Sequence, residues 1–316
     1  MIKRVRMMKL HKHETSQAYT MAELESKSSA FLLVTGPRSS ASSDVCSDSV
    51  KISDDFLKSH VNPDRYHSFD DVRSAIRQQG VKTCNVIFAI DYTISNETSG
   101  SKTFGGKSLH DLSVVNPYQK VITAIGETID PMRGENKTIN AFGFGDNEVK
   151  DKRIFPLSQE PCSSFYDILC AYKTKTKDIK FGGPTSFVPV LEEAIRIVKE
   201  TGKYHILIIV ADGQVTEEHS SLKAIIEASD YALSIVVIGV GDGPWELMEE
   251  WDDLENFNNK VAEQGLSNRR FDNFQFVNYH KITNKAKNPD IALALAALME
   301  IPDQYKFIKE NILVNV

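Results

Sequence analysis

Three almost continuous apolar runs constrain the fold of this chain more than any other feature. They read "NVIFAID" (85–91), "YHILIIVADG" (204–213) and "ALSIVVIGVGDG" (232–243). A strand with one face in water would alternate apolar and polar residues, whereas an unbroken apolar run is typical of a strand covered on both faces. The runs therefore predict the buried strands of a parallel sheet.

The segments between these runs have the periodicity of amphipathic helices. In residues 116–130, Asn116 is placed to cap a helix and Pro117 to occupy its first turn. Val121 and Ile125 follow at helical spacing and define one apolar face. Further helices are expected at 68–80, 164–173, 186–203, 220–231, 244–255 and 288–311, and further strands at 138–145 and 274–279.

Strands that alternate with helices indicate an α/β fold. We expect one doubly wound domain over residues 65–305, with a mostly parallel sheet flanked by helices. Residues 1–60 are rich in Ser, Lys and Thr, and we expect a poorly ordered N-terminal extension there. Residues 306–316 are expected to form a C-terminal tail.

Composition and charge exclude several classes of protein. The net charge of −6 does not favour a nucleic-acid-binding protein. No apolar run approaches the roughly 20 residues that span a bilayer. The first 13 residues are basic, and we interpret them as a solvated tail, with a weak contact to an anionic membrane surface as the alternative. The four cysteines form no Cys-x-x-Cys pair, so we expect a reducing compartment, cytoplasmic or nuclear.

Polar side chains with oxygen donors follow the predicted strands where each strand ends. Asp91 closes the first apolar run, and Thr93 and Ser95 follow it at alternate positions. Asp212 closes the second run, and Thr185 lies in the loop "FGGPTSF" ahead of a helix. In doubly wound folds the carboxyl ends of the strands form the ligand-binding edge. Two carboxylates and three hydroxyls at that edge suit Mg²⁺, which prefers oxygen ligands, and Mn²⁺ or Ca²⁺ is the alternative.

The motifs "DYTIS", "GPTSF" and "VADGQVT" resemble, in this order, the metal-ion-dependent adhesion site of von Willebrand factor A domains. More narrowly, "NPYQKVITAIGETI", "AFGFGD" and "ALSIVVIGVGDGPWELMEEWDD" resemble the copine group of these domains. "GDGPW" and "FDNFQFVN" are most similar to the copine-like RING ubiquitin ligases of the RGLG group. The resemblance runs from about residue 65 to 303 and implies a von Willebrand factor A fold, which is Rossmann-like.

Carried onto this chain, the resemblance implies a metal site and a mode of binding. It implies that Asp91, Thr93, Ser95, Thr185 and Asp212 ligate the ion, some of them through water. It also implies that an acidic side chain of a protein partner fills the vacant coordination position. A divalent cation that faces only two carboxylates can still attract a third. We therefore expect an intracellular, metal-dependent protein-interaction module with no catalytic residues.

The chain departs from the group in two ways. Copines carry C2 domains ahead of this domain, and only some 60 unpatterned residues precede it here. RING fingers need eight Cys or His ligands for two zinc ions, whereas the sequence after Asp212 contains no cysteine and only His219 and His280. We therefore expect no autonomous ligase activity, and a role in ubiquitin transfer only through a partner is the alternative function.

Two further alternatives remain open. The first is a Mg²⁺-dependent hydrolase, because "DYTIS" is similar to the Asp-x-Asp-x-Thr start of phosphotransferases, although Thr93 takes the place of the second carboxylate. The second is a structural domain whose metal site has decayed. Oligomeric state and the identity of the partner do not follow from the sequence.

Overall fold

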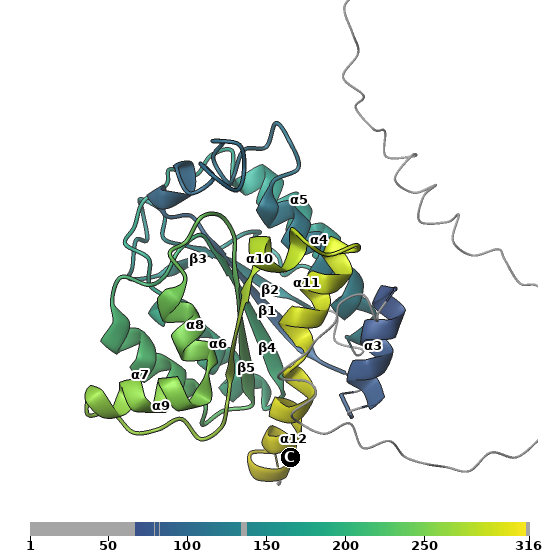
Figure 1. Ribbon diagram of the computed structural model, residues 1–316, viewed down its shortest axis with the longest axis vertical. Coiled ribbons are helices and arrows are strands. Elements are labelled where there is room, and N and C mark those ends of the chain that lie inside the picture. Colours follow the sequence, from purple (N-terminus) through teal and green to yellow (C-terminus); the bar gives the residue numbers. More distant parts are fainter. Residues whose placement is uncertain (1–66, 79, 82, 134–137, 314–316) are drawn as a thin grey trace, which may run out of the picture. The chain divides into compact units, whose positions relative to one another are not determined.

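Six strands form one sheet in the order β3-β2-β1-β4-β5-β6 in the computed structural model, which describes residues 67–78, 80–81, 83–133 and 138–313 (Figure 1). The expected N-terminal extension, residues 1–60, lies outside the described residues. The strands are β1 (Asn85–Asp91), β2 (Asn140–Phe144), β3 (Ile154–Pro156), β4 (His205–Ala211), β5 (Leu233–Gly239) and β6 (Phe274–Asn278).

The three apolar runs of the sequence become β1, β4 and β5, which are adjacent in the middle of the sheet. All pairings are parallel except that of β2 with the short edge strand β3. Every residue of β4 and β5 is buried, because helices cover both faces of the sheet. The prediction of a doubly wound, mostly parallel sheet is therefore confirmed.

Helices cover the two faces of the sheet (Figure 1). One face carries α3 (Phe69–Gln78), α4 (Pro117–Ile129), α5 (Phe165–Lys175) and α11 (Pro289–Leu298), and the other carries α6 (Val188–Thr201), α7 (Glu218–Ala228), α8 (Glu246–Asp252) and α9 (Leu254–Glu263). The predicted cap of α4 is present, because Asn116 and Gln119 form a reciprocal capping box. None of the helices in the described ranges is long and apolar enough to cross a membrane.

Two segments that we predicted as single helices are each divided in two. The expected helix at 244–255 breaks at Asp253, whose backbone is extended and whose carboxylate caps α9. The expected helix at 288–311 divides into α11 and α12 (Ile301–Asn311), with Pro302 in the first turn of α12. Proline lacks the N–H that would continue a helix and disfavours helical geometry in the residue before it. Helix α12 crosses residue 305, the predicted domain boundary.

Two short elements were not predicted. Strand β3 pairs with β2 in the antiparallel sense, and α10 (Tyr279–Thr283) follows β6 directly, with Asn278 as its cap. Two 3-10 turns, η2 (Ile94–Glu97) and η3 (Asp130–Met132), complete the described structure.

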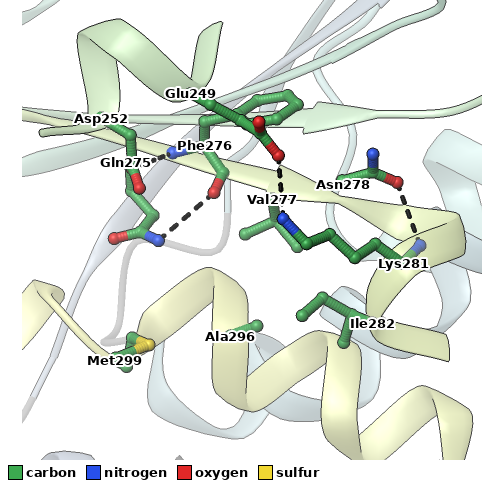
Figure 2. A pocket seen from close by; sticks show the side chains of 10 residues that line it. All are labelled: Glu249, Asp252, Gln275, Phe276, Val277, Asn278, Lys281, Ile282, Ala296 and Met299. Atoms are coloured by element: carbon green, nitrogen blue, oxygen red, sulfur yellow. Dashed lines mark hydrogen bonds and ion pairs between the residues drawn. The ribbon is translucent and has the colours of Figure 1, made fainter. Parts of the chain in front are cut away.

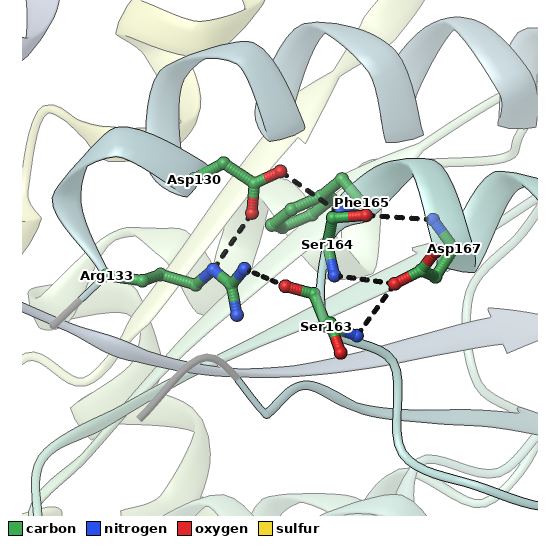
Figure 3. Close-up of polar contacts among 6 residues, drawn as sticks. All are labelled: Asp130, Arg133, Ser163, Ser164, Phe165 and Asp167. Atoms are coloured by element: carbon green, nitrogen blue, oxygen red, sulfur yellow. Dashed lines mark hydrogen bonds and ion pairs between the residues drawn. The ribbon is translucent and has the colours of Figure 1, made fainter. Parts of the chain in front are cut away.

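A polar cluster fixes the end of α4 to the beginning of α5 (Figure 3). Asp130 accepts hydrogen bonds from Arg133 Nε (2.9 Å) and from the backbone N–H of Phe165 (3.1 Å). Arg133 also donates to the carbonyl oxygen of Ser163 (2.5 Å). Ser164 caps α5 and shares a capping box with Asp167. The cluster satisfies backbone groups at both helix ends, which would otherwise lack partners.

Candidate metal centre

The two acidic residues predicted to hold a metal lie at the same edge of the sheet. Asp91 is the last residue of β1, and Asp212 directly follows the last residue of β4. Because β1 and β4 pair in parallel, their carboxyl ends meet at one edge. Both side chains have no exposed surface.

Two of the predicted hydroxyl ligands contact Asp212. The Ser95 hydroxyl donates to Asp212 Oδ1 at 2.9 Å, and the Thr93 hydroxyl donates to the same oxygen at 3.5 Å. The two hydroxyl oxygens lie 3.0 Å apart. Because Ser95 is only half-buried while Thr93 and Asp212 are buried, this cluster opens toward solvent on the Ser95 side.

The carboxylates of Asp91 and Asp212 are only partly satisfied by the protein. Asp91 Oδ1 accepts the backbone N–H of Thr93 at 2.7 Å. The other oxygen of each carboxylate is buried and accepts no hydrogen bond from the described residues. Burial raises the pKa of Asp91 well above its usual range, and the charge of Asp212 raises it further. Burial also raises the pKa of Asp212. A cation between the two carboxylates would relieve both costs.

Thr185 reaches this edge through its backbone. Its loop is tied to the Asp91 loop at Gly182, whose carbonyl accepts the N–H of Ile94 at 2.7 Å. The carbonyl of Thr185 accepts the N–H of Thr216, which lies in the Asp212 loop, at 3.0 Å. Thr185 therefore lies between the other two loops, but its hydroxyl makes no hydrogen bond to the other four predicted ligands. Ligation by Thr185 stays a prediction.

Gly145 permits close packing beside the centre. Its φ of +79° lies in the left-handed region, which favours glycine. A Cβ atom at this position would lie 2.5 Å from Thr93 Cγ2 and 3.2 Å from Asp91 Oδ1. The glycine in "AFGFGD" therefore lets the β2 loop pack directly against the loop that carries Asp91 and Thr93.

The loop that carries Asp91 also packs against buried residues that we did not predict as part of the site. The ring of His110 stacks between Tyr92 and Tyr118. Its Nε2 contacts the backbone carbonyl of Asp91 and its Nδ1 contacts the hydroxyl of Tyr172, both at 2.8 Å. Burial lowers the pKa of His110 to about 3. Both ring nitrogens are engaged, so His110 is not placed to act as the base of a serine hydrolase.

Asn96 and Tyr118 form a second support. Tyr118 donates its hydroxyl hydrogen to Asn96 Oδ1 at 2.7 Å, and Asn96 Nδ2 donates to the carbonyl of Thr93 at 3.1 Å. Both side chains are buried. A polar residue placed one position after the metal motif is the only sequence signal that could have indicated Asn96. Tyr118 carried no such signal, because it lies in an ordinary amphipathic helix.

Asp242 holds the loop that follows η2. It accepts hydrogen bonds from the Ser101 and Thr103 hydroxyls and from the backbone N–H groups of Lys102 and Thr103, at 2.6 to 2.9 Å. Although partial burial opposes the shift, these donors lower the pKa of Asp242 to about 2. The N–H of Asp242 also donates to the carbonyl of Ser99 at 2.8 Å, so Asp242 anchors residues 99–103 just after β5.

The donor set fits a hard divalent cation. Among the described residues, no three His, Cys, Asp or Glu side chains cluster where they could hold a metal. An ion held here by Asp91, Thr93, Ser95, Thr185 and Asp212 would therefore bind hydroxyl, carboxylate and water oxygens, as Mg²⁺ does. The two unpaired buried carboxylate oxygens are the observation that makes the residues fit such an ion.

Sequence comparisons relate this chain to one family of known proteins. The copine family model matches residues 108–315. The chain is 45% identical over 256 residues to Copine family protein 2 of Caenorhabditis elegans, covering 79% of this chain and 3% of that protein. It is 42% identical over 263 residues to the E3 ubiquitin-protein ligase RGLG4 of Arabidopsis thaliana, covering 77% of this chain and 63% of that protein. The chain thus spans less than two thirds of the length of either relative.

Solved structures are more distant. The manganese-loaded TRAP protein of Plasmodium vivax has a TM-score of 0.39 and 14% identity, with 66% of this chain and 74% of that chain covered. A von Willebrand factor type A structure from Catenulispora acidiphila has a TM-score of 0.38 and 12% identity, with 71% and 43% covered.

Proposed function

The chain belongs to the copine family, and from this premise and the geometry of the centre we propose that it is an intracellular, metal-dependent protein-binding module. In this proposal Asp91, Thr93, Ser95, Thr185 and Asp212 hold a Mg²⁺ ion at the carboxyl edge of the sheet. An acidic side chain of a protein partner then completes the coordination of the ion. The module acts in the cytoplasm or the nucleus.

The observation that carries the proposal is the pair of buried carboxylates, each with one oxygen that accepts no hydrogen bond from the described residues. Two adjacent carboxylates that lack counter-charges are costly to bury. Such an arrangement is reasonable where a bound cation pays that cost. Two carboxylates balance the charge of a divalent ion without filling its coordination sphere, so an acidic side chain of a partner could occupy a remaining position.

The contacts of the described residues at this site support binding rather than chemistry on the partner. His110 is engaged at both ring nitrogens, and the hydroxyls of Thr93 and Ser95 face the Asp212 carboxylate rather than a histidine. We therefore propose binding without catalysis, and the Mg²⁺-dependent hydrolase is the weaker alternative.

Metal binding is tested by thermal unfolding with and without Mg²⁺ or Mn²⁺. We expect the ion to stabilise the folded chain by about 2.7 kcal/mol at a concentration 100 times its Kd. The variant Asp91→Ala should lose this stabilisation, whereas Asp230→Ala, which removes an exposed acid, should keep it. A folded wild-type chain whose stability does not respond to either ion would instead favour a structural domain with a decayed site.

Partner binding is tested by affinity purification with the wild-type chain, Asp91→Ala and Asp230→Ala, each with Mg²⁺ and with chelator. We expect a set of proteins retained by the wild type and Asp230→Ala in Mg²⁺ only. Peptides from a retained protein, with Glu or Asp replaced by Gln or Asn, would then identify the acidic side chain. Partners that bind equally well in chelator would refute the proposal.

A second candidate function is a role in a ubiquitin-ligase pathway through a partner. The observation that favours it is the 42% identity to a plant protein named as an E3 ubiquitin-protein ligase. We propose that residues 65–313 do not conjugate ubiquitin themselves. The chain incubated with E1, E2, ubiquitin and ATP should therefore form no conjugates, and robust conjugation would contradict this.

A further inference from the structure

A groove of about 330 Å³ runs along the outer edge of β6, on the opposite side of the strand from β5 (Figure 2). Its walls come from α8 and α11, and α10 closes one end. The carbonyl of Asn273 accepts the N–H of Ile235 in β5. Because backbone groups of successive residues point to opposite sides of a strand, the N–H and C=O of Phe276 point outward into the groove.

Carboxylates line one side of the groove and apolar side chains line the other. Figure 2 shows Glu249 and Asp252 above the strand, and Ile282, Ala296 and Met299 below it. The volume lies at the lower end of the range for small-ligand sites. A ligand that fits both sides must therefore combine a positive group with an aliphatic stem.

Several oxygen acceptors meet at the Asp252 end with few donors among them. Asp252 Oδ1 accepts the N–H of Phe276 at 2.6 Å. The Gln275 amide is better satisfied with its nitrogen toward Glu300, where it donates to both carboxylate oxygens at 2.9 Å. In that orientation the amide oxygen takes the position 3.4 Å from the Phe276 carbonyl oxygen. Gln275 is 6% exposed, so this oxygen is a buried acceptor that faces another acceptor.

Among the described residues Asp252 forms no ion pair, although the positive charge of Arg269 acts on it. Lys281, which also lines the groove, is paired with Glu249 at 2.9 Å. Arg269 is paired with Asp272 at 2.7 Å. Burial raises the pKa of Asp252 to about 7, although the N–H of Phe276 opposes this. A donor that carries positive charge would satisfy the carboxylate and the two facing oxygens together.

We propose that this groove, the β6 groove, binds a lysine or arginine side chain of a partner protein. The charged head lies among the Asp252 carboxylate, the Gln275 amide oxygen and the Phe276 carbonyl. The methylene stem packs on Ile282, Ala296 and Met299, since long basic side chains commonly bury their stems while the head keeps polar partners. A bare metal ion would leave the apolar side of the groove unfilled.

The test uses the full ¹⁵N-labelled chain in chelator, so that the metal centre does not contribute. The probes are the Nα-acetyl methylamides of lysine, arginine and norleucine, the last of which has an aliphatic stem and no charge. We expect the lysine or arginine probe to shift the amide resonances of Phe276 and Asn278. Norleucine should bind at least about tenfold more weakly than these probes.

Two variants and one control sharpen the result. Asp252→Asn removes the charge but keeps an oxygen for the Phe276 N–H, and it should weaken binding of the basic probes about tenfold. Ala296→Leu narrows the groove with its charges intact and should also weaken binding. Glu192→Gln removes an exposed acid of α6 and should leave binding unchanged.

Three outcomes would overturn the proposal: norleucine binds as well as lysine and arginine, neither groove variant weakens binding, or Ca²⁺ shifts the same resonances while the organic probes do not. If Asp252→Asn proves unfolded, the probe series on the wild type and the Ala296→Leu variant still test the proposal. The organic probes are titrated in chelator, so loss of the metal-dependent function would not affect them, and Ca²⁺ is titrated separately without chelator.

Discussion

A side chain added at Gly145 would collide with residues of the proposed metal centre. The variant Gly145→Ala should place a Cβ against Thr93 Cγ2 and Asp91 Oδ1, in a backbone conformation that alanine rarely adopts. We expect a loss of unfolding free energy of more than about 1–2 kcal/mol, the cost of the left-handed backbone alone. The stabilisation by Mg²⁺ should also fall, because the ligand loop must shift.

Gly106→Ala is the matched control for that prediction. Gly106 has a φ of +75°, close to that of Gly145, but a Cβ there would meet nothing within 4 Å. Its variant should therefore show the backbone cost alone and an unchanged response to Mg²⁺. Thermal unfolding of both variants, with and without the ion, separates the two effects. An equal response to Mg²⁺ in both variants would show that close packing at Gly145 does not matter to the centre.

Asp252 should make the stability of the domain depend on pH. Burial raises its pKa to about 7; Asp272 and Asp253 add to this, and the Phe276 N–H and Arg269 oppose it. In the unfolded chain the carboxyl titrates near 3.9. Between about pH 4 and pH 7 the folded chain therefore holds a proton that the unfolded chain has released, so stability falls as pH rises through this window, and it is level on either side.

The measurement is urea unfolding of the wild type and Asp252→Asn at pH 5 and pH 8. We expect the wild type to lose stability relative to the variant, by up to about 1.4 kcal/mol for each pH unit within the window. Using the difference between the two proteins removes the contributions of all other titrating groups. The prediction fails if the difference is the same at both pH values.

At the scale of single elements, helix α5 offers a pair of neighbouring serines with different roles (Figure 3). The Ser164 hydroxyl accepts the N–H of Asp167 and caps the helix, whereas Ser163 contributes its backbone groups to the cluster. Ser164→Ala should cost about 1 kcal/mol of unfolding free energy, as loss of a cap usually does. Ser163→Ala should cost little, and chemical denaturation of both variants tests the difference. Equal costs would mean that the cap does not stabilise the helix.

The elements that the sequence predicted best were those that the hydrophobic effect alone determines. An unbroken apolar run such as 206–211 is stable only where helices cover both faces of the strand. The apolar runs therefore sufficed to predict β1, β4 and β5. The breaks at Asp253 and Pro302 were harder, because the apolar periodicity continues across both. The two breaks depend on a helix cap and on the geometry of proline. We gave these local signals less weight than the apolar periodicity when we predicted the helices.

The candidate site was predictable to a similar extent. Asp91, Thr93, Ser95 and Asp212 were visible because polar oxygens directly follow buried strands, and three of them do contact one another. The support by His110 was not visible, because residue 110 comes near residue 91 only through the path of the loop between them. Contacts of this kind depend on tertiary structure and leave no pattern in the sequence.

At the scale of the whole molecule, the domain that begins near residue 65 should fold without the residues that precede it. The described core draws its apolar side chains from residue 72 onward. A chain that begins at residue 65 should therefore unfold at the same temperature as the full chain and respond equally to Mg²⁺. Differential scanning calorimetry of both chains is the measurement. A lower unfolding temperature for the shorter chain would assign a stabilising role to the first 64 residues.

The parallel register of β1 and β4 also limits how chains of this kind can change in length. Ile90 lies opposite Val210, one residue before Asp91 and two before Asp212. One residue inserted into either strand would turn every following side chain to the other face of the sheet and carry the acid away from its neighbour. Insertions and deletions should therefore accumulate in connecting loops, whereas the two central strands keep a fixed number of residues wherever the two acids stay side by side.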